Sequence, residues 1–163
     1  MDDSKIDRLL ERTIAEFRSG GGKVEEGLDV DDPSLLQLRK SCRLLKAVNT
    51  MKEENGYYTL IIEASFSAIE RTIQFYLLES EYIRESDYVS HEDIYEGGVE
   101  VGLYGRDFKD DLLHLWRNNR SRTYYREGIG TAKSSELMSE IANKIHHHTL
   151  QLARKSHECI CDD

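Results

Sequence analysis

The feature that most constrains this chain is the recurrence of apolar residues at spacings of three and four positions, combined with a single proline, Pro33, in 163 residues. Such spacing places apolar side chains on one face of an α-helix. Because proline interrupts helices, a chain with only one favours long helices over a loop-rich β-sandwich. We therefore predict an all-α fold, and the length suits one domain.

The first predicted helix runs from Ser4 to about Phe17. It is followed by Gly20-Gly21-Gly22, which leaves the backbone unconstrained. Residues 23–31 are acidic and poor in apolar side chains, so we expect a loop there. The apolar face of the helix consists of Ile6, Leu9, Leu10, Ile14 and Phe17.

A second helix is predicted to begin at Asp32-Pro33 and to run to about Met51. Asp accepts hydrogen bonds from the free amides at a helix N-cap, and Pro is tolerated at the first helical position. Asn55-Gly56 then breaks the chain. The apolar stripe of this helix consists of Leu35, Leu38, Cys42, Leu45 and Val48.

The most apolar helix is expected from Tyr57 to about Tyr82. Its apolar side chains cover more than one face, which is typical of a helix at the centre of a bundle. The small residues between Ala64 and Ala68, including Ser65 and Ser67, make one part of it thin. A thin segment would permit the close approach of a neighbouring helix.

The stretch 79–100 holds eight acidic residues against one basic residue and contains Gly97-Gly98, so we expect a short helix and loops there. Asp107 can cap a fourth long helix that ends near Tyr124 and Tyr125. The stripe of that helix consists of Phe108, Leu112, Leu115 and Trp116.

A last helix is predicted to begin at Thr131 or Ser134. The sum is an up-and-down bundle of four main antiparallel helices with an additional N-terminal helix. Residues 1–31 form the N-terminal helix with its Gly-rich, acidic loop, and residues 32–163 form the bundle, as a single domain overall.

The net charge of −9 argues against coating duplex DNA, which requires an excess of Lys and Arg to neutralise phosphates. The apolar runs are far shorter than the roughly 20 residues that a membrane span needs. The start Met1-Asp2-Asp3-Ser4 differs from a cationic signal peptide, and three cysteines do not suggest a disulfide framework. We expect a cytoplasmic protein.

The most unusual segment is residues 117–126, which holds four arginines and no acidic residue. Because this segment carries +4 and the whole chain −9, the rest of the chain carries −13. Arginine offers a planar fork of donors that fits phosphate, and tyrosines interleaved with arginines suit stacking on unpaired bases. The candidate RNA- or phosphate-binding residues are Arg117, Asn118, Arg120, Arg122, Tyr124, Tyr125 and Arg126. The alternative is that these arginines stabilise a helix C-terminus and pair with the acidic stretch 79–100.

Arg117-Asn118, followed at a distance by Tyr124, resembles the motif of the HEPN superfamily of small helical bundles, over roughly residues 57–153 in helix order. In that family an Arg and a polar residue precede a His by four to six positions, and the toxin branch continues as His, any residue, Tyr. Arg122 stands here where His is expected. The resemblance implies catalytic roles for Arg117 and Tyr124 in a metal-independent ribonuclease.

The missing His weakens the catalytic expectation, because arginine does not give up its proton near neutral pH. Tyr124, Tyr125 or His114, one turn upstream of Arg117, would have to substitute. A site that binds RNA and cleaves it poorly or not at all is therefore expected.

The resemblance further implies a homodimer whose motif helices face each other, with two copies of the arginine segment forming one basic cleft. Ser65–Ala68 and Trp116 are candidates for that interface, and core packing explains them equally well. A second reading is a non-enzymatic interaction module, such as the partner of a minimal nucleotidyltransferase in a toxin–antitoxin pair. In that setting Tyr124 is the position that the family modifies by adenylylation.

Histidines and cysteines form two further clusters, to which we assign no metal or cofactor. His146-His147-His148 point in directions 100° apart on a helix and cannot all face one ion. His148 continues the apolar stripe of Ile141 and Ile145, so we expect it to be hydrogen-bonded in the core or an interface. His157, Cys159 and Cys161 offer zinc ligands without the spacing of a zinc finger, and the alternative is a frayed tail.

Overall fold

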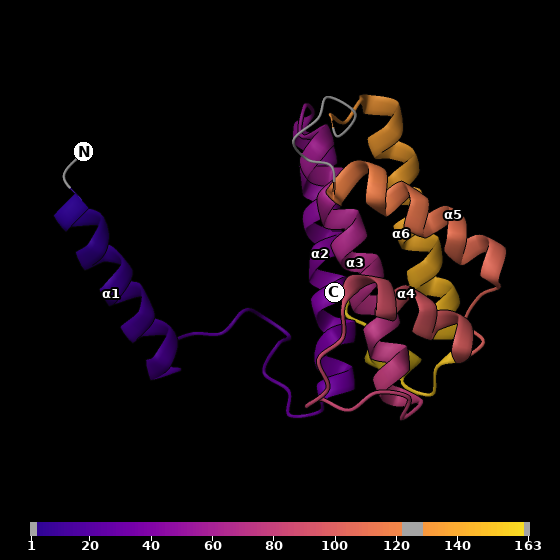
Figure 1. Ribbon diagram of the computed structural model, residues 1–163, viewed down its shortest axis with the longest axis horizontal. Coiled ribbons are helices and arrows are strands. Elements are labelled where there is room, and N and C mark those ends of the chain that lie inside the picture. Colours follow the sequence, from indigo (N-terminus) through magenta and orange to yellow (C-terminus); the bar gives the residue numbers. More distant parts are fainter. Residues whose placement is uncertain (1–2, 122–128, 162–163) are drawn as a thin grey trace.

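The computed structural model describes residues 3–121 and 129–161, and within these residues every regular element is helical (Figure 1). The all-α prediction is therefore confirmed. The elements are α1 (Asp3–Ser19), α2 (Pro33–Glu54), α3 (Tyr58–Glu79), α4 (His91–Glu100), α5 (Arg106–Trp116), the π-helix η1 (Arg117–Ser121), α6 (Ala132–Leu152) and the 3₁₀ helix η3 (Ser156–Glu158).

Helix α3 lies at the centre and packs between α2 and α6, while the shorter α4 and α5 cross one side (Figure 1). A three-residue connection makes α2 and α3 antiparallel. Helix α6 runs in the same direction as α3. At their starts the Gly130 N–H donates to Thr59 Oγ1 (2.9 Å), and beyond their ends the Arg154 N–H donates to Glu79 Oε1 (3.1 Å).

The thin part of α3 admits α2 closely, as predicted. The Ser41 hydroxyl of α2 donates to the backbone oxygen of Ala68 across a distance of 2.9 Å. Ser65 and Ala68 are buried inside the chain. These two residues therefore belong to the core of the chain and are not an exposed interface.

Helix starts follow the predicted signals at α2 and α6. The carboxylate of Asp32 accepts from the backbone N–H groups of Ser34 and Leu35. The N-cap of α6 is Thr131, whose hydroxyl accepts from the Ser134 N–H. The prediction that Asp107 caps α5 is wrong, because α5 begins one position earlier, after an N-cap at Gly105.

Helix α5 is also shorter than predicted, because the α-helical hydrogen-bond pattern stops at Trp116 and continues as η1. Gly97 and Gly98 lie inside α4, not in a loop. A Cβ at Gly97 would come within 2.9 Å of Leu77 on α3, and one at Gly98 would overlap the ring of Tyr104. Two glycines thus allow this short helix to lie against its neighbours.

Helix α1 lies apart from the bundle, connected to it by residues 20–32 (Figure 1). The predicted extent of α1 is confirmed. Its apolar face is exposed to solvent, and the exposed fraction of Phe17 is 85%. Beyond the glycines, the connection contacts the bundle, since Glu25 pairs with Arg43 (2.6 Å). None of the helices in the described ranges is long and apolar enough to cross a membrane.

Candidate functional site at the end of helix α5

The structure describes part of the predicted RNA-binding segment. Arg117 and Asn118 lie in η1, directly after α5, and Arg120 belongs to the same π-helix. The other predicted site residues lie outside the described residues, namely Arg122, Tyr124, Tyr125 and Arg126.

A π-helix at this position is informative, because π-helical turns are rare and occur frequently at functional sites. The wider turn begins at Arg117, the first residue of the predicted motif. The Asn119 side chain donates to the backbone oxygen of Leu115 (2.9 Å), which supports the junction between the two helix types. The motif therefore coincides with the local departure from α-helical geometry.

Arg117 is half-exposed and pairs with Glu92 of α4. Its Nε and Nη2 both donate to Glu92 Oε1, at 3.1 and 2.9 Å. The pairing of the arginine segment with the acidic stretch, which the sequence left as an alternative, is thus present for Arg117. Since both side chains are more than half exposed, this pair contributes little stability and can exchange for another anion.

His114, one turn upstream of Arg117 and one of the predicted substitutes for the missing His, lies beside the motif. Its Nε2 is 2.8 Å from Asn118 Nδ2. An amide nitrogen can only donate, so Nε2 accepts this hydrogen bond. His114, Arg117 and Asn118 therefore form one polar group at the end of α5, in which His114 and Arg117 are exposed and Asn118 is partly buried.

Trp116, which precedes Arg117, packs against the core. Its ring lies 5.2 Å from that of His91 and 6.4 Å from that of Tyr95. Both of these residues contact the buried carboxylate of Glu70, since the Tyr95 hydroxyl donates to it (3.2 Å) and His91 Nδ1 lies 3.0 Å from its other oxygen. Sequence reasoning missed Glu70, although a carboxylate inside the most apolar helix was a usable signal.

Two side chains of the acidic stretch 79–100 serve local structure. Asp93 caps α4 together with Ser90, and Glu96 pairs with Arg106 (2.8 Å) and Lys109 (3.0 Å). His148 is hydrogen-bonded to Leu103 O (3.2 Å), as expected, but it is exposed.

The buried histidine of the triplet is His146, which lies beside Cys159 and Cys161. His157, which the sequence analysis grouped with Cys159 and Cys161, has a side chain that is 75% exposed and lies near Glu158. The tail is packed through Cys161 and is not a frayed end. Residues of the two predicted clusters therefore lie together, since His146 of the histidine triplet contacts Cys159 and Cys161 of the second cluster.

Comparison with protein-family models matches residues 1–161 to a family described as a domain of unknown function, DUF8154. Because the match spans almost the whole chain, the chain belongs to this family. Comparisons with curated proteins and with solved structures gave no match.

Proposed function

We propose that this chain is a HEPN-like homodimer that binds RNA or nucleotide phosphate at the end of α5. The observation that supports this most is the polar group of His114, Arg117 and Asn118 at the start of the π-helix. The other predicted phosphate-binding residues follow in the sequence, namely Arg120, Arg122, Tyr124, Tyr125 and Arg126.

Phosphate can take the place that Glu92 occupies beside Arg117. The guanidinium already presents two N–H groups to one carboxylate oxygen. A phosphate offers the same acceptor geometry with more charge, so it competes well for an exposed arginine. On a body with net charge −13, a focused basic segment attracts single-stranded RNA while the remaining surface repels long duplexes.

Binding with weak or no cleavage is the expected activity. The family motif places His where this chain has Arg122, which cannot transfer a proton. Residual catalysis would depend on His114, which is hydrogen-bonded to Asn118 beside Arg117, or on Tyr124. The homodimer would bring two such segments together, giving two arginine forks on one RNA strand.

The test measures binding of a fluorescently labelled single-stranded RNA by anisotropy at two salt concentrations. Arg117→Ala should weaken binding by about 10- to 100-fold, since a hydrogen-bonded charge contributes about 1.5–3 kcal/mol and about 1.4 kcal/mol corresponds to a factor of ten. The matched control is Arg106→Ala on the first turn of the same helix, because Arg106 is also exposed and paired with a glutamate of α4. The proposal fails if wild type shows no salt-sensitive RNA binding, or if Arg117→Ala and Arg106→Ala lose the same amount of RNA affinity.

A non-enzymatic interaction module is the second candidate, and the exposed apolar face of α1 favours it. An apolar stripe that the described residues leave exposed suits a protein partner, such as a minimal nucleotidyltransferase. In this case Arg117→Ala would alter the oligomeric state, measured by light scattering, while RNA binding would be absent from wild type as well.

A further inference from the structure

Four metal-ligating side chains from three parts of the chain converge at one point. Cys42 comes from α2, His146 from α6, and Cys159 and Cys161 from the C-terminal tail. Their ligand atoms all lie within 4.8 Å of one another. Cys42 and His146 are almost completely buried, at 1% and 0% exposure, and the other two are half-buried.

The separations of the ligand atoms match the edges of a tetrahedron around one zinc ion. Zn–S bonds of about 2.3 Å and Zn–N bonds of about 2.0 Å give S–S edges of about 3.8 Å and S–N edges of about 3.5 Å. The Sγ atoms of Cys42 and Cys159 are 3.5 Å apart. His146 Nε2 lies 3.7, 3.4 and 3.2 Å from the sulfurs of Cys42, Cys159 and Cys161.

We propose that Cys42, His146, Cys159 and Cys161 bind a single zinc ion in a closed Cys₃His site. Four protein ligands leave no position open for water or substrate, so the role of the ion is structural. It fastens the C-terminal tail to α2 and α6. The site is independent of the RNA-binding proposal and shares no residue with it.

The orientation of the His146 ring supports metal binding. Its Nδ1 lies 3.2 Å from Ser41 Oγ and 3.1 Å from Thr72 Oγ1. The Ser41 hydroxyl also donates to the backbone oxygen of Ala68, so its oxygen is free to accept from Nδ1–H. A proton held on Nδ1 leaves the Nε2 lone pair directed at the three sulfurs, as in zinc sites whose histidines are oriented by a second hydrogen bond.

The three sulfurs share one small, largely buried position, where they lie within 4.8 Å of one another and of the histidine ring. Zinc binds cysteine as the thiolate, so the bound ion would stabilise three deprotonated thiols there as their protons leave.

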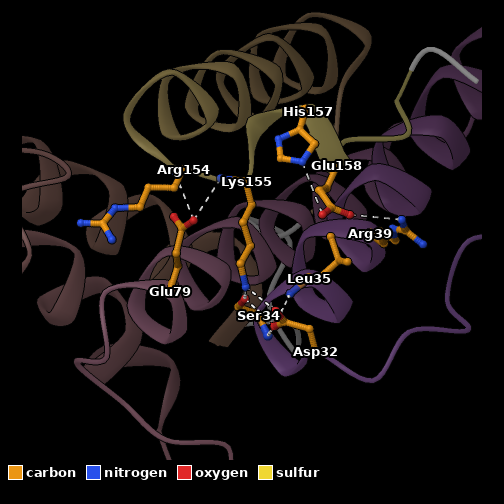
Figure 2. Close-up of polar contacts among 9 residues, drawn as sticks. All are labelled: Asp32, Ser34, Leu35, Arg39, Glu79, Arg154, Lys155, His157 and Glu158. Carbon is orange, nitrogen blue, oxygen red and sulfur yellow. Dashed lines mark hydrogen bonds and ion pairs between the residues drawn. The ribbon is translucent and has the colours of Figure 1, made fainter.

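The tail is held in place by contacts outside the site (Figure 2). Glu79 of α3 accepts hydrogen bonds from the backbone N–H groups of Arg154 and Lys155, both at 3.1 Å. The Lys155 ammonium contacts both Asp32, as an ion pair, and Ser34 Oγ (2.8 Å) at the start of α2. These contacts hold residues 154–155 against the end of α3 and the start of α2, a few positions before Cys159.

Two further contacts lie beside the site itself. Glu158, which precedes Cys159, lies 3.6 Å from Arg39 on α2 (Figure 2). The side chain of Ile160, between the two cysteines, packs against Gly27, where a Cβ would overlap it. The cysteines are thus delivered to Cys42 by packing as well as by charge.

Other chemistries fit this geometry less well. A disulfide requires sulfurs about 2.05 Å apart, and Cys42 and Cys159 are 3.5 Å apart and free. An iron–sulfur cluster has several iron and sulfide atoms inside its ligand shell, which ligand atoms this close together do not enclose. Thiolates with one imidazole around a single ion are the ligands that zinc prefers.

The experiment measures metal in the full-length purified chain by elemental analysis and by native mass spectrometry. We expect one zinc per chain. Cys161→Ser should weaken zinc binding by about a hundredfold or more, and Cys161 is only half-buried, which favours folding of the variant. His157→Ala is the control, because His157 neighbours the site in sequence and is exposed. Cobalt(II) titration of wild type is a second readout, with sulfur-to-cobalt charge-transfer absorption expected.

Three results would overturn the proposal. The first is a wild-type chain without stoichiometric zinc and without cobalt charge-transfer absorption. The second is a disulfide between two of the three cysteines or an iron–sulfur spectrum in the freshly purified protein. The third is a loss of zinc in His157→Ala as large as in Cys161→Ser. Should Cys161→Ser not fold, the cobalt spectrum of wild type alone decides the point.

Discussion

His146 Nε2 lies 3.2 Å from Cys161 Sγ, where the C-terminal tail has turned back against the last helix. The ring is fixed from its other side by Ser41 and Thr72, which hydrogen-bond Nδ1. One histidine thus connects two hydroxyl groups of the α2–α3 interface to the thiols of the tail. Its orientation decides whether a tetrahedral zinc site can form.

The first prediction concerns these hydroxyl groups. Replacing both in Ser41→Ala with Thr72→Val removes the acceptors that hold the His146 ring, so zinc affinity should fall about 10- to 100-fold while the ligands remain. Competition with a chromophoric chelator measures the affinity. Ser139→Ala is the control, since this buried hydroxyl of α6 donates within its own helix to Glu136 O. Equal affinity in wild type and the double variant would contradict a positioning role.

The second prediction concerns pH and the contact between Asp32 and Lys155. The hydrogen bond from Lys155 lowers the pKa of Asp32 below its ordinary value, so the carboxylate stabilises the fold above the unfolded pKa of about 4. This stabilisation is lost as the pH falls through the lowered, folded-state pKa. Because both side chains are partly exposed, we expect about 0.5–1 kcal/mol.

The variant Asp32→Asn isolates that charge, because Asn also caps helices well. Urea unfolding should show Asp32→Asn less stable than wild type at pH 7, and the difference should shrink below about pH 4. Glu136→Gln is the comparison, since its exposed pair with Lys133 lies on the surface of α6. A difference for Asp32→Asn that is the same at pH 7 and pH 3 would exclude the charge as its cause.

Local sequence signals were sufficient for the helices and insufficient for the metal-ligand cluster. Asp32-Pro33 predicted the start of α2, and the stripe through Cys42 predicted which face of α2 is buried. Both rest on interactions within a few residues. The meeting of Cys42 with Cys159 spans 117 positions and depends on how the tail is held by Glu79 and Asp32. No local pattern encodes that contact.

The two differences at α5 have local causes of another kind. Asp107 is an acceptable N-cap by residue type, but the chain is already helical at Arg106, and Gly105 takes the cap position. The end of the helix was placed too late, because a π-helical turn has no apolar spacing of its own to reveal it. The RNA-binding reading of the segment that follows stays a prediction.

The third prediction concerns Gly98, which allows α4 to pass the Tyr104 ring. The Tyr104 hydroxyl donates to the backbone oxygen of Tyr95 (3.0 Å), so the ring cannot move away without losing this bond. Gly98→Ala should therefore cost about 1–3 kcal/mol in the free energy of unfolding, measured by urea denaturation. Gly21→Ala is the control, because Gly21 lies outside the helices and a Cβ there meets nothing within 4 Å. Equal stability of the two variants would contradict the close approach.

The last prediction separates α1 from the connection that follows it. The apolar side chains of α1 are exposed, so deleting residues 1–22 should leave the free energy of unfolding within about 0.5 kcal/mol of wild type. Deleting residues 1–31 should cost considerably more. That deletion removes the Gly27 oxygen that accepts from Arg39 (3.1 Å), the Glu25 partner of Arg43, and Val30, which packs against the core.

Thermal unfolding of the two truncated chains locates where the bundle begins. Because Gly27 also contacts Ile160 in the tail, the longer deletion should additionally weaken zinc binding, whereas the shorter one should not. A loss of stability already present in the 1–22 deletion would mean that α1 packs on the bundle in solution. Retention of stability and of zinc in the 1–31 deletion would mean that the contacts of the connection contribute nothing to holding the tail.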